Sequence, residues 1–373
     1  MSATTTVDIP LVDLRAQHDE VSREVAEGFE RVMATTGFIG GPVVDDFERA
    51  LGQWWGSEHV IGVGNGTDAL ELMLRAAGVG RGDEVIVPAN SFIATASAVV
   101  RAGARPVFVD VDPVYLLIDP ERVAEQLTDR TRAVIAVHLF GQMAPMEALA
   151  DAVSGRSVVL LEDAAQAHGA RRHDRPPGSV GVAAATSFYP GKNLGAYGDG
   201  GAVLTDRVEF ARRVRLLSNH GATSKYNHAE LGFNSRLDAL QAVVLHAKLA
   251  RLSTWNGARR RAAAAYGELL GHMGPIWLPE VMAGNEHVWH LYPIRLSRRD
   301  ELLDALQSRG IGAGVHYPVP LHLQGAFADL GHRPGQFPNA EEAAARLLSL
   351  PLHPHLTSAQ QEFIASVVTD HVA

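Results

Sequence analysis

The sequence predicts an α/β protein built around a mostly parallel β-sheet. Short runs rich in Val, Ile and Leu alternate with helical segments between residues 59 and 204. The runs are apolar along nearly their whole length, which is typical of strands covered by helices on both faces. Polar residues gather where several of the runs end, and such sheets bind ligands at the carboxyl ends of their strands. We therefore expect a ligand site at that edge.

Length and composition describe an ordinary globular chain. Its 373 residues allow one large domain and one smaller domain, which we expect at 1–254 and 255–373. A formal net charge of −9 argues against nucleic acid as a partner. The chain has no cysteine, which excludes disulfides, thiolate zinc sites and cysteine nucleophiles. We find no leader pattern and no apolar run of bilayer length, so we expect no membrane partner and a cytoplasmic location.

Two helices are expected near the N-terminus. Apolar residues recur at helical spacing from Val21 to Val32, and a Gly- and Pro-rich break separates them from a second helix at 43–55. We expect this pair to pack on the large domain or on a second subunit.

A strand, a Gly-rich turn and a helix follow at 59–77. Backbone N–H groups at Gly66 and the hydroxyl of Thr67 are suited to a phosphate, because a helix N-terminus attracts anions. The turn also fits the pattern G-x-G-x-x-A, so an NAD-dependent oxidoreductase is an alternative at this point. A capped helix without a ligand is another.

The other elements follow from the same periodicities. Strands are expected at 83–87, 105–109, 132–138 and 158–161, and helices at 91–102, 120–127, 146–153 and 208–217. An irregular polar loop is expected at 220–234, before a long helical region at 237–270 in which Arg259, Arg260 and Arg261 lie on a solvated face. The smaller α+β domain is predicted to contain strands at 288–296 and 312–317 and helices at 299–309, 340–348 and 358–368.

Lys192 stands in a tight turn between two apolar runs, the first ending at Ser187 and the second at 201–204. Its neighbours include Phe188 and Leu194, and an amine in apolar surroundings loses hydration, so its pKa falls. Such an amine attacks carbonyl groups and forms a Schiff base. A lysine that reaches out to water is the alternative.

Other strand ends carry groups that fit a pyridoxal phosphate (PLP) ring. Asp163 would keep the ring nitrogen protonated, Gln166 would bond the ring hydroxyl, and Phe92 would stack on the ring. Ser187 and Thr67 would hold the phosphate. Capping of the next turn is the alternative role for Asp163.

Long motifs identify the chain as similar to a known family. The sequence resembles the DegT/DnrJ/EryC1/StrS family of PLP-dependent nucleotide-sugar aminotransferases over nearly its whole length. The resemblance implies the aspartate-aminotransferase fold (PLP fold type I), with a large domain of the seven-stranded type and a homodimer with active sites at its interface. The shared stretches are PLVDLRAQH, GNGTDALELMLRAAGVGRGDEVIVPANSFIATASAV, VDVDP, AVHLFGQMAPM, LLEDAAQAHGA, SFYPGKNLGAYGDGGAV, LGFNSRLDALQA and GVHYPVPLHLQ.

The resemblance also implies roles for single residues. Lys192 takes the Schiff-base position, and Asp163 and Lys192 are the implied catalytic pair. The implied cofactor-binding residues are Gly66, Thr67, Phe92, Asp163, Gln166, Ser187, Lys192 and, from the other subunit, Asn234. The implied substrate-binding residues are Tyr189, His220, Lys225, His316 and Tyr317.

The implied reaction moves an amino group from an amino acid, L-glutamate by family habit, to a nucleotide-linked keto-deoxyhexose. We expect a dTDP sugar, amination at C3, and a place in deoxyaminosugar and antibiotic biosynthesis. His220 stands where many 3-aminotransferases have tyrosine, so amination at C4 stays an alternative. Non-enzymatic relatives often lack the lysine, and dehydratases of the family carry histidine there, so Lys192 argues against both.

Overall fold

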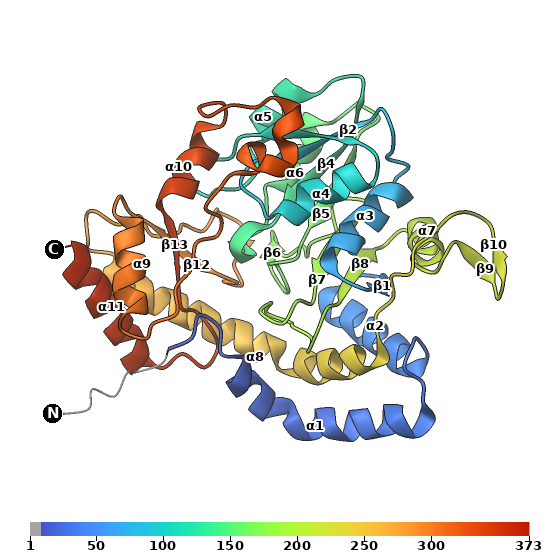
Figure 1. Cartoon of the computed structure of the whole chain (residues 1–373), viewed down its shortest axis with the longest axis horizontal. Helices are drawn as coiled ribbons and strands as arrows, with labels where there is room; N and C mark the ends of the chain where they lie inside the picture. Colours follow the sequence, from blue (N-terminus) through green and yellow to red (C-terminus); the bar gives the residue numbers. More distant parts are fainter. Residues whose placement is uncertain (1–8, 373) are drawn as a thin grey trace.

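A seven-stranded sheet forms the centre of the computed structural model, which describes residues 9–372 (Figure 1). Its strand order is β1-β8-β7-β5-β4-β2-β3. Only β8 runs antiparallel to its neighbours, so the prediction of a mostly parallel sheet is confirmed. The strands are β1 (His59–Val63), β2 (Glu84–Pro88), β3 (Arg105–Val109), β4 (Thr131–Val137), β5 (Val159–Asp163), β7 (Ala183–Ser187) and β8 (Gly201–Thr205).

Helices cover both faces of this sheet. Successive strand residues point to opposite faces, so Leu161 of β5 joins one apolar core and Leu160 the other. The first face is covered by α3 (Gly66–Ala76), α4 (Ile93–Arg101), α7 (Val208–Ser218) and α10 (Pro338–Arg346). The second is covered by α2 (Pro42–Trp55), α5 (Pro120–Gln126), α6 (Met146–Ala152) and α8 (Ala239–Leu270).

The C-terminal part has its own apolar core. Strands β12 (Tyr292–Arg295) and β13 (Leu347–Leu350) pair antiparallel, and α9 (Arg299–Gln307) and α11 (Ser358–Val372) pack against them. Ile9 is fully buried in this core and pairs with Ile311. Helix α8 runs without a break through the expected domain boundary at residue 254, and the division into two domains stays a prediction.

Three local expectations were wrong. Residues 312–317 form no strand and make only a single bridge, from Gly314 to Ser349. The helix expected at 340–348 ends at Arg346, because the buried Leu347–Leu350 segment pairs with β12 instead. Arg259 is not solvated: only 1% of it is exposed, and its Nη1 donates to the carbonyl oxygens of Trp289 and Leu352.

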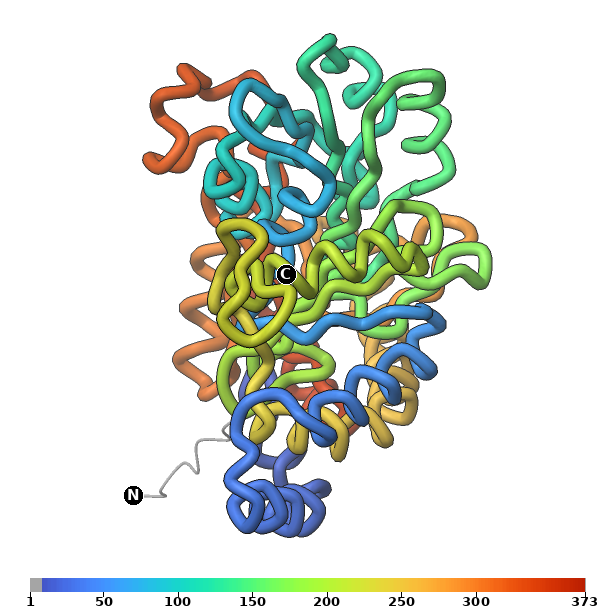
Figure 2. The backbone as a smooth tube through the Cα atoms, turned by 90° about the vertical axis from the view of Figure 1, so that its right-hand side faces the viewer, coloured from blue at the N-terminus to red at the C-terminus, as the bar shows by residue number. Residues whose placement is uncertain are grey.

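A two-stranded hairpin projects from the edge of the molecule beyond α7 (Figure 1). It consists of β9 (Ala222–Ser224) and β10 (Asn227–His228), where an irregular loop was expected. Figure 2 shows α1 (Leu14–Thr35) at the lower end of the molecule, next to the start of α8. Two further short strands pair, β6 (Arg171–Arg172) and β11 (Asn285–Glu286). Within residues 9–372, the helices are too short or too polar to cross a bilayer.

Candidate active site

The ends of β5 and β7 place Asp163 and Ser187 on one face of the sheet. The two strands are parallel neighbours, and Asp163 pairs with Ala185. Ser187 therefore lies two residues farther along the adjacent strand, with its side chain on the same face as that of Ala185. This face also receives the N-terminus of α3, so Asp163, Ser187 and the start of α3 lie at the carboxyl ends of the strands.

The carboxylate of Asp163 is buried and held by hydrogen bonds. Its Oδ2 accepts from Thr95 Oγ1 at 2.8 Å, and its Oδ1 accepts from the backbone N–H of Ala165 at 3.2 Å. A carboxylate only accepts hydrogen bonds, so the Thr95 hydroxyl must donate its hydrogen to Asp163. Ser91, which lies 2.7 Å from Thr95 Oγ1, must then donate to Thr95. The hydrogen bonds from Ser91 to Thr95 and from Thr95 to Asp163 fix the direction in which the carboxylate faces.

Gly66 and Ser187 form a narrow cradle. A Cβ added at Gly66 would lie 2.6 Å from the Cβ of Ser187, a separation that real side chains do not reach. Gly66 and Thr67 open α3, and first-turn N–H groups have no acceptor within their helix. Together with the serine hydroxyl, these donors and the positive helix end are suited to a phosphate group.

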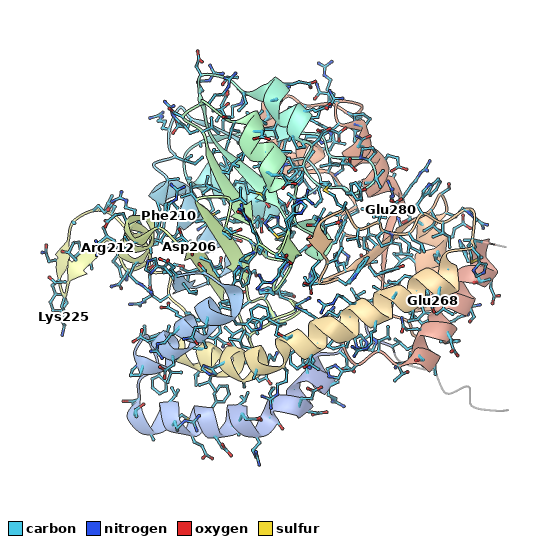
Figure 3. All side chains as sticks on the ribbon, turned by 180° about the vertical axis from the view of Figure 1, so that it is seen from behind. Asp206, Phe210, Arg212, Lys225, Glu268 and Glu280 are labelled. Carbon is cyan, nitrogen blue, oxygen red and sulfur yellow. The ribbon has the colours of Figure 1, made fainter. Side chains whose placement is uncertain are left out.

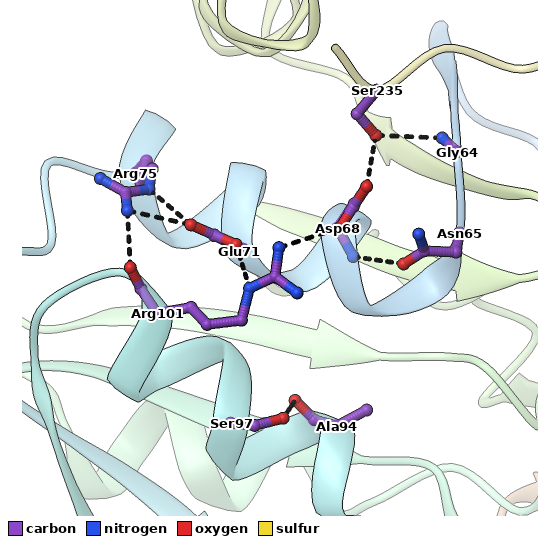
Figure 4. A network of polar contacts seen from close by, with 9 residues as sticks. All are labelled: Gly64, Asn65, Asp68, Glu71, Arg75, Ala94, Ser97, Arg101 and Ser235. Carbon is purple, nitrogen blue, oxygen red and sulfur yellow. Dashed lines mark hydrogen bonds and ion pairs between the residues drawn. The ribbon is translucent and has the colours of Figure 1, made fainter. Parts of the chain in front are cut away.

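Polar contacts hold the start of α3 in place (Figure 4). Asn65 caps the helix by accepting from the N–H of Asp68 at 2.8 Å. Ser235 donates to Asp68 Oδ2 at 2.9 Å and accepts from the N–H of Gly64 at 3.0 Å. Arg101 lies 3.2 Å from the other oxygen of Asp68. Both carboxylate oxygens of Asp68 therefore have partners outside the cradle. Ser235 thereby ties the segment that follows Asn234 to the cradle.

Lys192 lies in the turn after β7. Its backbone N–H donates to the carbonyl of Tyr189 at 2.8 Å, and the residue is half-buried. Desolvation lowers the pKa of its amine to about 8, and the charge of Asp163 opposes that shift. The lowered pKa expected from the apolar neighbours of Lys192 is therefore found, and Asp163 is close enough to influence it.

Gln166 and Tyr317 form a second side of the site. Gln166 Oε1 accepts from the backbone N–H of Phe140 at 2.5 Å, and its Nε2 donates to the hydroxyl of Tyr317 at 3.2 Å. Burial, and then the charge of Asp163, raise the pKa of Tyr317 above its ordinary value. The ring of Phe92 lies 5.5 Å from that of Tyr317, and 53% of Phe92 is exposed, so it does not belong to the core. The structure thus groups Phe92, Gln166 and Tyr317.

His316 precedes Tyr317 across a cis peptide bond. Its Nδ1 lies 3.0 Å from the hydroxyl of Ser349. Burial, and then the charge of Lys192, lower the pKa of His316 to about 4, so the imidazole is neutral near pH 7. His316 and Lys192 are therefore near enough to interact.

The remaining predicted residues lie outside this group. Tyr189 is 61% exposed. His220, Lys225 and Asn234 are exposed on the hairpin and the segments beside it. In Figure 3, Lys225 lies at the tip of the hairpin, with its side chain directed away from the body of the chain. Lys225 therefore lies away from the body of its own chain.

Sequence reasoning missed several polar side chains around Lys192. Thr95 follows Phe92 by one helical turn, which could have indicated a residue facing the same site. Asn193 adjoins Lys192 and bonds Asn256 and His290, but nothing in the local pattern predicted those distant partners. A second lysine, Lys248, is buried, and its Nζ donates to the carbonyl of Gly195 at 2.7 Å.

The arrangement fits PLP. The Gly66–Ser187 cradle suits its phosphate, the Asp163 carboxylate suits a cationic ring nitrogen, and a nearby amine of lowered pKa suits its aldehyde. A carboxylate beside an amine that is partly neutral near pH 8 also suits proton transfer at a carbon next to a nitrogen. The fold and the site therefore define a PLP-dependent enzyme of fold type I.

Comparison with known proteins agrees with this class. The profile of the DegT/DnrJ/EryC1/StrS aminotransferase family matches residues 19–369. A Streptomyces venezuelae protein named dTDP-3-amino-3,4,6-trideoxy-alpha-D-glucose transaminase is 44% identical over 96% of this chain and 95% of its own. A Geobacillus stearothermophilus protein named pleiotropic regulatory protein is 45% identical over 98% of both chains. The crystal structure of S. venezuelae DesV in complex with a ketimine intermediate superposes with a TM-score of 0.96, at 43% identity, over 98% of this chain and 99% of that one.

The chain belongs to the DegT/DnrJ/EryC1/StrS aminotransferase family. It is an aminotransferase, and its cofactor is PLP.

Proposed function

We propose that this enzyme transfers the amino group of L-glutamate to C3 of a dTDP-linked keto-deoxyhexose, in the cytoplasm, as a step of deoxyaminosugar biosynthesis. The observation that carries the proposal is the 44% identity, over nearly the whole of both chains, to a transaminase named for a dTDP-3-amino sugar. The site supports it, because the residues suited to PLP lie beside aromatic and imidazole groups that suit a sugar.

The cofactor would be held by residues that the structure groups at the strand ends. When bound, PLP supplies an electron sink for the bond that breaks at the donor's Cα. Asp163 would provide the carboxylate for the ring nitrogen, and Gln166, whose Nε2 donates to Tyr317, would lie beside the ring hydroxyl. The phosphate would be held by Gly66, Thr67, Ser187 and Asn234 of the partner subunit, and Phe92 would cover the ring.

Lys192 would act twice in this reaction. Its Nζ is the amine that binds the cofactor, and once free it takes the proton from Cα of the donor and returns a proton to the sugar carbon. An amine with a pKa of about 8 is suited to both roles, because both of its protonation states are populated near neutral pH.

The sugar pocket would be built by two subunits. Tyr189, His316 and Tyr317 of one subunit line it, and His220 of the partner subunit and Lys225 of the partner subunit complete it. Two observations support a homodimer of this kind. The hairpin directs Lys225 away from the body of its own chain, and 86% of Tyr226 in the hairpin turn and 96% of Leu231 just after the hairpin are exposed. Exposed apolar groups on a projecting hairpin are typical of an interface.

The regiochemistry can be tested in the reverse direction, which starts from the amino sugar. The enzyme is incubated with 2-oxoglutarate and dTDP-3-amino-3,4,6-trideoxyglucose, or with dTDP-4-amino-4,6-dideoxyglucose as the C4 comparison, and glutamate is measured. We expect glutamate from the 3-amino sugar at a rate at least about tenfold higher, which corresponds to about 1.4 kcal/mol. Preference for the 4-amino sugar would establish amination at C4 instead.

The role of Lys192 is tested with Lys192→Ala. Borohydride treatment of the wild-type enzyme with PLP should attach the cofactor covalently to the peptide containing Lys192, as read by mass spectrometry, and Lys192→Ala should lose both this adduct and turnover. Lys248→Ala is the control, since Lys248 is buried and its amine is already bonded to the carbonyl of Gly195. An unchanged steady-state rate in Lys192→Ala would show that Lys192 is not the catalytic amine.

The shared site is tested by mixing two variants. Lys192→Ala and Asn234→Asp should each be inactive as homodimers. After unfolding and refolding together, hybrid dimers should contain one site with neither substitution, which restores about a quarter of the wild-type activity by random pairing. If the mixture stays inactive while hybrids form, Asn234 serves the site of its own chain.

A further inference from the structure

The side chain of Asn193, next to Lys192, is almost fully buried, and both its nitrogen and its oxygen have hydrogen-bond partners. Its Nδ2 donates to Asn256 Oδ1 and to the carbonyl of Val288, both at 3.0 Å. Its Oδ1 lies 3.2 Å from Nδ1 of His290. Both amide hydrogens and one acceptor position of Asn193 are thereby used.

These partners come from segments far apart in the sequence. Asn256 lies in the middle of α8, and its own Nδ2 donates to the carbonyl of His168 at 2.8 Å. Val288 and His290 lie in the segment before β12. The turn that carries Lys192 cannot shift without leaving buried polar groups unpaired, which is unfavourable because such groups have lost their water partners.

The hydrogen bonds determine which nitrogen of His290 carries its proton. The carbonyl of Val288 can only accept, so the Asn193 atom that faces it is Nδ2, and the atom that faces His290 is an oxygen. The Nδ1 of His290 therefore carries a hydrogen and donates it to Asn193. Burial, followed by the charges of Lys192 and Arg259, lowers the pKa of His290 well below its ordinary value, so its Nε2 carries none.

The same network continues to the other side of the site. The backbone N–H of His290 donates to the carbonyl of Phe140 at 2.8 Å, and the N–H of Phe140 donates to Gln166 Oε1 at 2.5 Å. Phe140 has a φ of 62°, and a Cβ on the next residue, Gly141, would lie 2.9 Å from the nitrogen of His290. Phe140 and His290 are thus in tight contact, and an unbroken series of bonds joins Asn193 to Gln166.

We propose that Asn193 and His290 are positioning residues that hold the amine of Lys192 at a set place relative to Gln166. The proposal rests on the function proposed above for Lys192. Neither residue needs to touch the cofactor or the sugar: Asn193 acts through its neighbour in the chain, and His290 acts through Asn193.

Two substitutions of His290 separate this role from simple packing. His290→Asn places an amide N–H where the Nδ1–H now lies, whereas His290→Gln places it near Nε2. Asn193→Ala removes the whole connection. We expect His290→Asn to behave like the wild type, and His290→Gln and Asn193→Ala to free the Lys192 turn, which lets water reach the amine.

The readout is the reactivity of Lys192 in the cofactor-free protein. The protein is labelled with an amine-selective reagent over a range of pH, and the labelled fraction of the Lys192 peptide is quantified by mass spectrometry. The wild type should give a pKa of about 8 for Lys192. In His290→Gln and Asn193→Ala it should rise toward 10.5, and a rise of one unit lowers the labelling rate below pH 8 about tenfold.

Asn339→Ala is a matched control for the loss of a side-chain amide. The Nδ2 of Asn339 donates to the carbonyl of Val111 at 2.8 Å, outside the network around Lys192. This variant should lose thermal stability and keep the wild-type labelling of Lys192.

The result that would overturn the proposal is wild-type labelling in folded Asn193→Ala and His290→Gln. If Asn193→Ala does not fold, the two His290 variants are compared instead. Equal labelling of Lys192 in His290→Asn and His290→Gln rejects the proposal. Failure of the proposed function looks different, because PLP would then be trapped as well in Lys192→Ala as in the wild type.

Discussion

The hydroxyl of Thr95 donates a hydrogen bond to Oδ2 of Asp163 at 2.8 Å, and both residues are buried. The hydroxyl of Ser91 in turn contacts that of Thr95. Thr95 and Asp163 come from different elements, α4 and β5, so the bond between them joins a helix on one face of the sheet to the end of a central strand. It fixes the orientation of the carboxylate, which is what a partner for a ring nitrogen requires.

Replacing Asp163 by Asn should leave PLP bound and slow turnover by orders of magnitude. The amide keeps the size of the side chain but loses the negative charge that keeps the ring nitrogen protonated. Retention is read from the visible spectrum after gel filtration, and the rate from single turnovers with glutamate. Unchanged kinetics would show that the ring nitrogen is handled by another group.

Thr95→Val should lower kcat about tenfold, corresponding to about 1.4 kcal/mol for a lost hydrogen bond to a charged group. Valine keeps the shape of threonine, and Asp163 keeps its bond to the N–H of Ala165. Ser97→Ala is the matched control on the same helix, because Ser97 donates only to the carbonyl of Ala94 (Figure 4). Equal rates in the two variants would argue against a role for Thr95.

Gly66→Ala should weaken PLP binding by about tenfold or more, or about 1.4 kcal/mol. The added methyl would lie 2.6 Å from the Cβ of Ser187, so the phosphate cradle must open. Gly80→Ala is the control, since a Cβ there meets nothing within 4 Å. The dissociation constant is measured by titrating the cofactor-free protein with PLP. Equal affinity in both variants would place the phosphate elsewhere.

Covalent capture of PLP should depend on pH through Lys192. The amine attacks only when neutral, and its lowered pKa of about 8 means that the neutral form becomes dominant above pH 8 rather than above 10.5. The initial rate of borohydride-trapped incorporation should therefore rise about tenfold per unit below pH 8 and level off above it. A rise that continues to pH 10 would mean that the amine is well hydrated.

Mild acid should destabilise the cofactor-free protein through its buried histidines. Burial lowers the pKa of His168 and His287 to about 3 and that of His353 to about 4. As the pH falls through 6.5, the unfolded chain binds protons that the folded chain excludes, so the free energy of unfolding falls by about 1.4 kcal/mol per pH unit for each such histidine.

Urea titrations between pH 7.5 and 5 measure this slope, above the range where most carboxylates titrate. His353→Gln should reduce the slope by one histidine's share, whatever it does to the stability at pH 7.5. A slope that His353→Gln leaves unchanged would mean that His353 takes up its proton without unfolding.

The parallel sheet could be predicted from the sequence because each buried strand is a short apolar run with helical segments around it. Asp163, Ser187 and Lys192 could be placed at strand ends for the same reason. The C-terminal part was harder. Leu347–Leu350 continues the apolar pattern of the preceding helix, and only pairing with β12, more than fifty residues earlier, makes it a strand.

The hydrogen bonds of Asn193, beside Lys192, could not be predicted, because they join residues 63 to 97 positions apart in the sequence. Asn193 looks like an ordinary loop residue until Asn256 and His290 are placed beside it. Arg259 was expected in water because it begins a run of three arginines, yet two backbone carbonyls bind it in the interior. No local pattern carries such information.

The unbroken course of α8 affects how the molecule can move. Its 32 residues span about 48 Å at 1.5 Å per residue, and the helix packs on the central sheet at one end and contributes to the C-terminal core at the other. Two units joined by a flexible linker swing freely, whereas units that share a helix move only as far as the helix bends. Access for a bulky substrate should therefore depend on loops and on the approach of a second subunit, and proteolysis near residue 254 should release no stable fragment.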